Sequence, residues 1–388
     1  MSVAARLATA DGRRLEIVTS EERLAAIAPA WNALWREADG LVFQSHGWIS
    51  AWWRTTSGRE RRNLLIGLVW NGEVLETVMP FAVNRRRGVR ILEWAAKDHS
   101  DYGDLLALPG WKRDAAAALW REIARQGSFD MAYLNRLLPD AAARELLATP
   151  GAAIGLRPNH RSEINYRVAG PWSSGSQWFE QQSKKTRQNY RRGRKFMEET
   201  GELRFRLMEP DEPLQPVLAR VAALKRKWLE RHGHASDLFD EGSHALPALV
   251  EEMARLGILH VFVLECAGDV VAVSINLVQR DRMMAFVTTY DPEFERGSPG
   301  MVLMMDYIQW SIDHGLRMVD FLCGGEDFKR RFATRSETLG SFVGARTLLG
   351  RLALLADGAG HALRSRNAPS QPPAEELAEA VAPARSHR

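Results

Sequence analysis

The sequence has very few cysteines and no long apolar run. Its 388 residues include only Cys266 and Cys323, which are too few for a disulfide framework and have no CxxC spacing. Both lie in apolar runs, so we expect buried free thiols in a reducing compartment. No stretch approaches the roughly 18 consecutive apolar residues of a membrane-spanning helix, and the first residues lack the apolar core of a secretory signal. These absences predict a cytoplasmic protein.

The chain also lacks a large surplus of one charge, because its formal net charge is only +4. A dedicated nucleic-acid-binding protein usually carries a larger excess. The positive charge is instead concentrated in residues 183–195, SKKTRQNYRRGRK, which contain seven cations and no acid. On a helix, Lys184, Arg187 and Arg191 would share one face. Such a face suits phosphate groups, although a solvated surface explains it equally well.

Two parts of the chain show the same order of predicted elements. Residues 63–83 and 258–278 each predict a β-hairpin around a glycine turn. Each hairpin is followed by a further strand, a helix (111–127 or 300–315) and another strand. The sequence therefore predicts an α/β (α+β) fold of two similar domains, each a mixed, largely antiparallel sheet flanked by helices.

Other apolar patterns predict further helices and the limits of the domains. Residues 21–37 and 214–233 have helical spacing, and 45–56 forms a helix for which Ser45 is a suitable N-cap. The composition changes at about Asn367 to a stretch rich in alanine, proline and glutamate, which is typical of disordered or weakly helical segments. The expected division is an N-terminal domain, a C-terminal domain and a tail, at residues 1–168, 169–355 and 356–388.

Five stretches in a fixed order resemble the CelD/BcsL family of the GNAT acetyltransferase superfamily. The resemblance is strong over roughly residues 160–345. The N-terminal half is more loosely similar to double-GNAT proteins of the Fem aminoacyl transferase type. Any one stretch alone would be a weak indication, whereas the order makes the resemblance specific. The five stretches read SKKTRQNYRRGRKFMEETGELRF, ALKRKWLERHG, AGDVVAVSINL, TYDPEFERGSPGMVL and DFLCGGEDFKRRF.

The resemblance implies transfer of an acyl group from acetyl-CoA or another acyl-CoA to an amine. In this family the acceptor is an amino sugar or a lipid-linked saccharide in exopolysaccharide or cellulose-type biosynthesis. That setting implies contact with polysaccharide synthesis machinery and leaves peripheral attachment to the inner membrane open. Two alternatives stay open. One is a Fem-like transfer from aminoacyl-tRNA to a cell-envelope precursor, and the other is a non-catalytic binding subunit of a polysaccharide synthase.

The donor-binding turn of the superfamily normally reads Gln/Arg-x-x-Gly-x-Gly/Ala. Residues 296–301 here read RGSPGM, so Pro299 stands where the first glycine belongs and removes one N–H donor. The resemblance still places Ser298, Gly300 and Met301 at the donor, because a helix starting there would offer its free N–H groups to a pyrophosphate. It also assigns the donor's phosphates to the basic face of residues 183–195.

The catalytic candidates follow the donor turn and the last strand of the second repeat. Tyr290 precedes the turn, and in GNAT chemistry a hydroxyl there protonates the leaving thiolate. Glu326 or Asp320 would act as the base that deprotonates the attacking amine, while Lys329 anchors a carboxylate or phosphate. Each has a purely structural alternative, such as an Asp320–Lys329 ion pair. Neither cysteine has a nucleophile–base arrangement, so we expect direct transfer without a covalent enzyme intermediate.

The acceptor is expected between the two domains. The resemblance places Trp228 near the acceptor as a stacking wall for a sugar ring, with core packing as the alternative. Asp101 and Tyr102 in the stretch KDHSDYGD (97–104) would face the same groove. The acids and His99 of this stretch match no zinc or calcium pattern, and turn chemistry also explains them. We therefore expect no metal cofactor.

Overall fold

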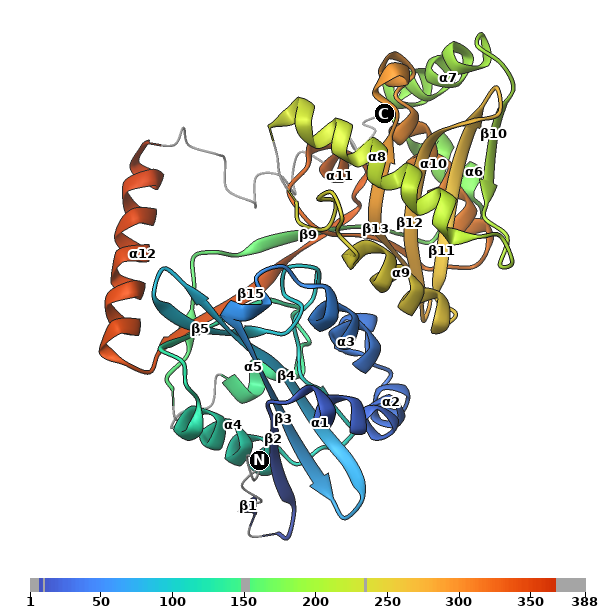
Figure 1. The fold of residues 1–388 in the computed structure, drawn as a ribbon. Helices are drawn as coiled ribbons and strands as arrows, with labels where there is room; N and C mark the ends of the chain where they lie inside the picture. Colours follow the sequence, from blue (N-terminus) through green and yellow to red (C-terminus); the bar gives the residue numbers. More distant parts are fainter. Residues whose placement is uncertain (1–6, 10, 148–153, 234–235, 368–388) are drawn as a thin grey trace, which may run out of the picture.

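A single mixed β-sheet forms the centre of the protein, seen here in a computed structural model that describes residues 7–9, 11–147, 154–233 and 236–367. Thirteen strands of the sheet follow the order β1-β2-β3-β4-β5-β7-β15-β9-β14-β13-β12-β11-β10, with β6 beside β4 and β8 beside β15 (Figure 1). The strands are β1 (Leu7–Ala8), β2 (Arg14–Val18), β3 (Arg62–Asn71), β4 (Val74–Arg86), β5 (Val89–Trp94), β6 (Leu106–Ala107), β7 (Met131–Leu137), β8 (Arg157–Pro158), β9 (Glu163–Ala169), β10 (Leu203–Leu207), β11 (Leu259–Cys266), β12 (Asp269–Gln279), β13 (Arg282–Tyr290), β14 (Met318–Cys323) and β15 (Arg335–Ala345).

Helices cover both faces of this sheet and lie between its strands in the chain. Three short 3₁₀ helices are η1 (Val42–Gln44), η2 (Arg59–Arg61) and η3 (Pro292–Gly297). The α-helices are α1 (Glu21–Ala26), α2 (Ala28–Glu37), α3 (His46–Thr55), α4 (Arg113–Gln126), α5 (Ala142–Leu147), α6 (Gly175–Gln181), α7 (Lys184–Glu198), α8 (Leu214–His232), α9 (Ala245–Arg255), α10 (Pro299–Asp313), α11 (Asp327–Phe332) and α12 (Leu348–Asn367).

The repeated order of elements predicted from the sequence is confirmed. The first repeat runs β3, β4, β5, α4 and β7, and the second runs β11, β12, β13, α10 and β14. In both, the hairpin and the third strand pair antiparallel, whereas the strand after the helix returns parallel to the third strand. The fold is therefore the predicted mixed α/β arrangement of two similar repeats.

The two repeats share one sheet because two strands cross between them. Strand β15 pairs with β7 of the first repeat and with β9, and β9 pairs with β14 of the second repeat. The expected domain boundary after residue 168 therefore falls inside β9. The second boundary, after residue 355, falls inside α12, the helix that follows β15 and lies at the left of Figure 1. Residues 368–388 of the predicted tail lie outside the described part of the chain.

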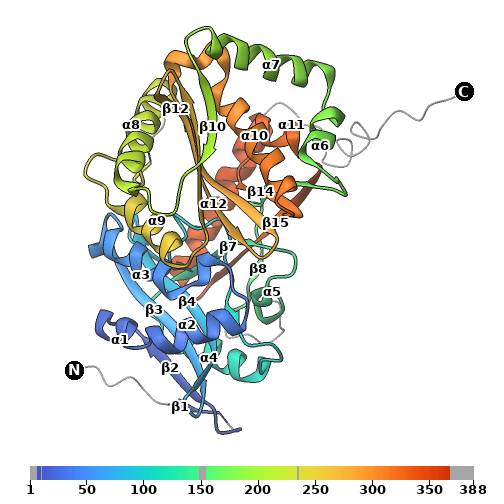
Figure 2. The same cartoon turned by 90° about the vertical axis from the view of Figure 1, so that its right-hand side faces the viewer.

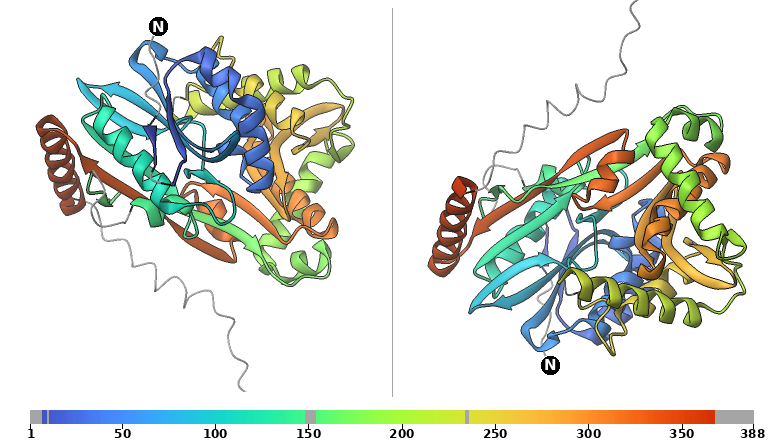
Figure 3. Two further views of the ribbon diagram at one scale, coloured as in Figure 1. Left: turned by 90° about the horizontal axis from the view of Figure 1, so that it is seen from below. Right: turned by 90° about the horizontal axis from the view of Figure 1, so that it is seen from above.

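Three clusters of apolar side chains fill the spaces between the sheet and its helices. One cluster is common to both halves, because α3 packs against α9 and both cover the same face of the sheet (Figure 2). A second lies under α4 in the first half, and a third lies under α10 in the second half. The views in Figure 3 show the helices on both faces. The halves are thus held by a shared core as well as by shared strands.

Most of the predicted helices are confirmed, and one is wrong in detail. The Ser45 side chain accepts the N–H of Trp48 at the start of α3, as its N-cap position predicts. The helix predicted over 21–37 is two helices that meet at Ile27. Pro29, in the first turn of α2, has no N–H to continue the hydrogen-bond ladder from α1. No helix in the described part of the chain is long and apolar enough to cross a membrane.

Candidate functional site

The strands β13 and β14 separate soon after they begin to pair. Their parallel register covers only the three pairs from Arg282 to Met284, although β13 continues to Tyr290. A β-bulge at Phe286 interrupts the pairing of β13 with β12 on its other edge. In β14, the buried Leu322 has a positive φ of 59°, a conformation that is costly for a residue with a branched side chain. Both strands are therefore distorted where they part.

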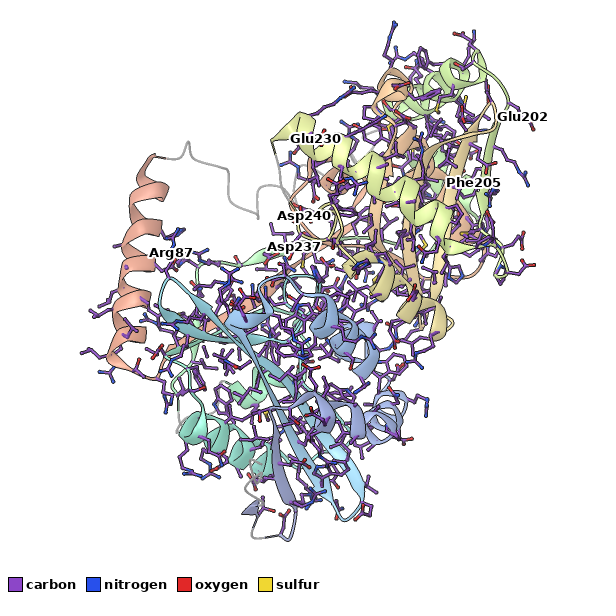
Figure 4. The ribbon with its side chains drawn as sticks, in the orientation of Figure 1. Arg87, Glu202, Phe205, Glu230, Asp237 and Asp240 are labelled. Atoms are coloured by element: carbon purple, nitrogen blue, oxygen red, sulfur yellow. The ribbon has the colours of Figure 1, made fainter. Side chains whose placement is uncertain are left out.

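A cavity of about 760 Å³ opens at this separation. Its walls come from β13, from the start of α10, from α8, from the segment after β14 and from the loop after β5. The loop after α8, where Figure 4 labels Asp237 and Asp240 near the junction of the two halves, supplies a further wall. Eight of the predicted site residues line the cavity: Asp101, Trp228, Tyr290, Ser298, Gly300, Met301, Glu326 and Lys329.

The predicted donor turn forms one end of the cavity. Ser298 has the left-handed φ of 49°, and α10 begins directly after it at Pro299. The carbonyl of Ser298 accepts the N–H groups of Met301 and Val302, which leaves the Gly300 N–H without an acceptor among the described residues. A Cβ on Gly300 would lie 3.1 Å from the Tyr290 ring, so glycine allows this close approach. The helix start thus offers few N–H donors, as Pro299 predicts.

The basic helix α7 packs beside this turn but does not line the cavity. Gly193 of α7 is so close to η3 that a Cβ there would lie 2.3 Å from the Gly297 carbonyl oxygen. Lys184, Arg187 and Arg191, predicted to bind the donor's phosphates, are absent from the cavity wall. The Arg191 guanidinium lies 5.8 Å from the ring centre of Phe179. The basic run of residues 183–195 does lie on a helix, α7, whereas its contact with the donor stays a prediction.

Tyr290 lies between the donor turn and the wall formed by α8. Its hydroxyl hydrogen-bonds with the indole of Trp228. Burial raises the pKa of Tyr290, and the nearby Glu295 carboxylate raises it further. Tyr290 therefore stays protonated at neutral pH, as a proton donor must.

Asp320 requires a correction, because it does not reach the cavity. Its side chain is fully buried and accepts hydrogen bonds from the Tyr102 hydroxyl, the Asn165 amide and the Leu322 N–H. Arg167 adds an ion pair at 3.3 Å. A carboxylate so fully engaged is placed to hold elements together and not to take a proton from an acceptor. The predicted pair with Lys329 is likewise not formed.

Tyr102 needs the same correction. It was expected to face the acceptor, but its side chain is buried and its hydroxyl donates to both oxygens of Asp320 at 2.8 Å. Sequence alone could not separate it from Asp101, the neighbouring residue that does line the cavity. The Asp101 side chain lines the cavity, whereas the Tyr102 side chain is buried in the protein. This difference depends on Asp320 of β14, the hydrogen-bond partner of Tyr102, which is far from both residues in the chain.

Lys329 and Asp101 hold the segment after β14 in place. The Lys329 ammonium donates to the Cys323 carbonyl at 2.6 Å and lies 3.0 Å from the Glu326 carboxylate. Asp101 accepts the Cys323 N–H at 3.1 Å, and burial raises its pKa. Burial also raises the pKa of the Cys323 thiol, which stays protonated and donates to the Asp101 carbonyl. The Cys323 thiol therefore does not act as a free nucleophile.

Several cavity residues were not assigned from the sequence. Lys225 of α8 lies one helical turn from both Val221 and Trp228, which belong to the apolar stripe of this helix. This spacing is the signal in the sequence that Lys225 faces the same side as Trp228. His99 was noticed only as part of an acidic turn; burial lowers its pKa, so it is neutral at pH 7. Thr289 lines the cavity, and its buried hydroxyl has no hydrogen-bond partner among the described residues.

No group of three or more potential metal ligands comes together anywhere in the described ranges. Asp98, which neighbours His99, is instead paired with Arg62 at 2.8 Å. Asp104 of the same loop accepts the backbone N–H groups of Ala142 and Ala143. These acids therefore have partners from the protein itself.

Residues 184–330 match the family model described as an acetyltransferase (GNAT) domain. This segment is similar to GNAT acetyltransferase domains. It contains the two strands that separate, the donor turn and α8, so the cavity belongs to an acyltransferase. The match supports the GNAT superfamily; the closer resemblance to the CelD/BcsL family stays a prediction. No curated protein sequence matches the chain.

Solved structures share this fold over nearly the whole chain. FemX has a TM-score of 0.55 at 10% identity, and the comparison covers 88% of this chain and 99% of FemX. L-PGS from Bacillus licheniformis has a TM-score of 0.51 at 11% identity, covering 87% and 95%. The C-terminal domain of a proposed lysylphosphatidylglycerol synthetase from Agrobacterium fabrum has a TM-score of 0.53 at 14% identity, covering 87% and 96%. At such identities the similarity concerns the fold alone.

Proposed function

We propose that the protein transfers an acyl group from acetyl-CoA or another acyl-CoA to the amine of an amino sugar or related acceptor. The setting we propose is bacterial exopolysaccharide or cellulose-type biosynthesis, with a saccharide acceptor handled at the cytoplasmic face of the inner membrane. The cavity where β13 and β14 separate carries the proposal, because it joins a donor turn to an acceptor wall within a GNAT acetyltransferase domain.

Several features of the cavity suit an acyl-CoA donor. Beyond Met284, the edge of β13 that faces β14 has no β partner, so its backbone groups are available to the amides of an extended thioester arm. The unpartnered Thr289 hydroxyl offers a further hydrogen bond. The Gly300 N–H is available to bind a phosphate at the start of α10. Glu295 at the same end repels a phosphate, so we expect modest donor affinity.

The residues present support direct transfer. The neutral amine of the acceptor attacks the thioester carbonyl, a C–N bond forms, and the ammonium proton passes to a base. The tetrahedral intermediate then collapses with cleavage of the C–S bond. Tyr290, protonated and held by Trp228, gives its proton to the leaving thiolate and regains one from solvent. The protonated Cys323 is not suited to form an acyl-enzyme.

Two cavity residues are candidates for the base now that Asp320 is excluded by its burial. Glu326 is accessible, with 53% of its side chain exposed, and its partner Lys329 keeps it close to the cavity. His99 is neutral because burial lowers its pKa, so it can accept a proton near pH 7. We favour Glu326, which lies in the GNAT domain together with the donor turn.

Thioester consumption with a panel of amino sugars tests this function. We expect release of free thiol from acetyl-CoA by the wild type, and a fall of about 10²-fold or more in kcat for Glu326→Gln. Asp327→Asn is the matched control, since Asp327 is 88% exposed and pairs with Arg330 on the surface. Equal activity of Glu326→Gln would shift the base to His99. Ligand binding with no thioester consumption for any acceptor would indicate a non-catalytic subunit.

A second candidate function is transfer from aminoacyl-tRNA to a cell-envelope precursor. The observation that favours it is α7, whose exposed cations lie next to the donor turn but outside the cavity, where a large polyanion has access to them. A gel-shift titration with tRNA tests it, because binding through several phosphates falls steeply with salt. Loss of the complex in a Lys184→Ala/Arg187→Ala/Arg191→Ala variant would support this function. No complex at low salt would exclude it.

A further inference from the structure

Lys225 lies inside the cavity between two aromatic rings. Its ammonium nitrogen is 4.6 Å from the centre of the Trp228 ring, one turn along α8, and 6.0 Å from that of Phe239 in the loop after α8. All three residues line the cavity wall. The rings favour a cation at this place, because the faces of aromatic rings are electronegative. The charge is thereby directed into the cavity, away from bulk solvent.

Lys225 differs from the other cavity cations because it has no hydrogen bond or ion pair with the described residues. Arg136 donates to Glu163 at 3.0 Å, and Lys329 donates to the Cys323 carbonyl and pairs with Glu326. Burial lowers the pKa of Lys225, and the attraction of Glu326 only partly opposes this effect. A half-buried ammonium without an anionic partner is costly. The Lys225 side chain is therefore placed to bind an anion that a ligand supplies.

The charged groups around Lys225 also leave it without an anionic partner. Glu326 attracts Lys225, whereas Lys329 repels it. Lys329 already contacts the Glu326 carboxylate at 3.0 Å and is also attracted by Asp101. Lys225 therefore has no carboxylate of its own among the described residues. This corner lies beside the segment after β14, whereas the donor turn at Ser298 and Gly300 lies next to Tyr290. Lys225 is thus on the acceptor side of the site.

We propose that Lys225 binds a negatively charged group, a phosphate or a carboxylate, carried by the amine acceptor. Trp228 and Phe239 would contact the adjoining part of the acceptor, with the amine directed toward Tyr290. The proposal rests on the proposed function for its division into donor and acceptor sides. It narrows the acceptor to an anionic amine, for which a neutral amino sugar is a poor substitute.

Binding of small sugars, measured by calorimetry without any acyl donor, tests this proposal. Glucosamine 6-phosphate carries a phosphate at C6, glucuronate carries a carboxylate there, and glucosamine is the probe without an anion. We expect at least one anionic probe to bind about 10-fold or more tightly than glucosamine, and the better of the two identifies the group. Lys225→Met should abolish that preference and Lys225→Arg should retain most of it, since both lysine and arginine bind such anions.

Lys227→Met is the matched control, because Lys227 is exposed on the same helix and does not line the cavity. It should leave the preference unchanged. An NMR titration of the Lys225 side chain, assigned by its absence in Lys225→Met, gives a second readout. An anion bound there raises the pKa of Lys225, and glucosamine does not. This shift is expected even if Lys225→Met alters the fold.

Three results would overturn the proposal. They are equal binding of charged and neutral probes by the wild type, a preference that survives Lys225→Met, and a Lys225 pKa that no anionic probe changes at about 10 mM, a concentration sufficient for weak sites. None of these experiments measures thioester consumption. The proposed acyl transfer can therefore hold when this proposal fails, and it fails separately if acyl-CoA does not bind.

Discussion

The Tyr102 hydroxyl donates to both carboxylate oxygens of Asp320 at 2.8 Å, and so ties the first half of the chain to β14 of the second half. Asn165 of β9 donates to the same carboxylate at 2.7 Å. Burial raises the pKa of Tyr102 well above its usual value, and Asp320 raises it further, so the hydroxyl keeps its proton. The segment after β14 that carries Glu326 and Lys329 is thus positioned by a contact from the first repeat.

Removal of this hydroxyl should destabilise the protein. Tyr102→Phe leaves the buried Asp320 short of a donor, which typically costs about 1–3 kcal/mol. Urea unfolding followed by circular dichroism measures the loss. Tyr166→Phe is the control, because its hydroxyl on the same strand as Asn165 makes no hydrogen bond with described residues. Equal stability of the two variants would mean that the Tyr102–Asp320 contact contributes nothing.

A methyl group at Gly193 should push α7 away from the donor turn. The added carbon would lie 2.3 Å from the backbone oxygen of Gly297, which cannot yield as a flexible side chain would. We expect Gly193→Ala to lose about 1–3 kcal/mol of stability, as overpacked sites do, and to weaken acetyl-CoA binding. Gly358→Ala, in a helix with nothing within 4 Å, should be neutral or gain up to about 1 kcal/mol. Identical melting temperatures would refute the close contact.

The protein should lose stability at acidic pH as Asp98 becomes protonated. Burial raises its pKa, but the attraction of Lys97 and Arg62 outweighs that effect and lowers the pKa to about 2. Because the folded pKa lies below the ordinary value of 3.8, the stabilisation is present above about pH 4 and is lost as the pH falls through 2. Asp98→Asn should cost up to about 2 kcal/mol at pH 7, and the difference from wild type should vanish near pH 2.

The matched control for that pH series is Asp327→Asn, whose carboxyl is 88% exposed. It should follow the wild-type profile throughout. A wild-type curve parallel to that of Asp98→Asn between pH 7 and pH 2 would show that the Arg62–Asp98 pair is not formed in solution.

Tyr290→Phe should slow the collapse of the intermediate without changing donor affinity. Loss of a positioned acid typically lowers kcat by about 10²–10⁴-fold. A thioester whose thiol is more acidic needs less protonation, so the variant should lose less activity with such a donor than with acetyl-CoA. The ratio of kcat values for the two donors, wild type against variant, is the measurement. An equal loss with both donors would assign Tyr290 to binding and not to proton transfer.

The local elements could be predicted because their signals are local. Apolar spacing identified α8 and α10, and the glycine turns identified both hairpins. Strand β15 could not be assigned to either half from the sequence, since its pairing with both β7 and β9 depends on residues far away in the chain. The predicted two-domain division therefore missed that the two repeats share one sheet.

The site shows the same limit at single residues. Tyr290 and Gly300 follow from motif order and line the cavity together. Asp320 has the carboxylate that a catalytic base needs, but this carboxylate accepts structural hydrogen bonds from the side chains of Tyr102 and Asn165. Lys225 lies in one of the resembling stretches, ALKRKWLERHG, but the resemblance assigned it no role. Only the three-dimensional arrangement distinguishes a carboxylate that is satisfied from an ammonium that is not.

Calorimetric titration with acetyl-CoA tests the central claim, that the space between β13 and β14 holds the donor. Ala285 lines this space on β13, so Ala285→Phe would fill it, whereas Ala356→Phe adds the same bulk on the exposed face of α12. We expect micromolar binding by the wild type and by Ala356→Phe, and binding about 10-fold or more weaker by a folded Ala285→Phe. No binding by the wild type, or undiminished binding by Ala285→Phe, would contradict this claim.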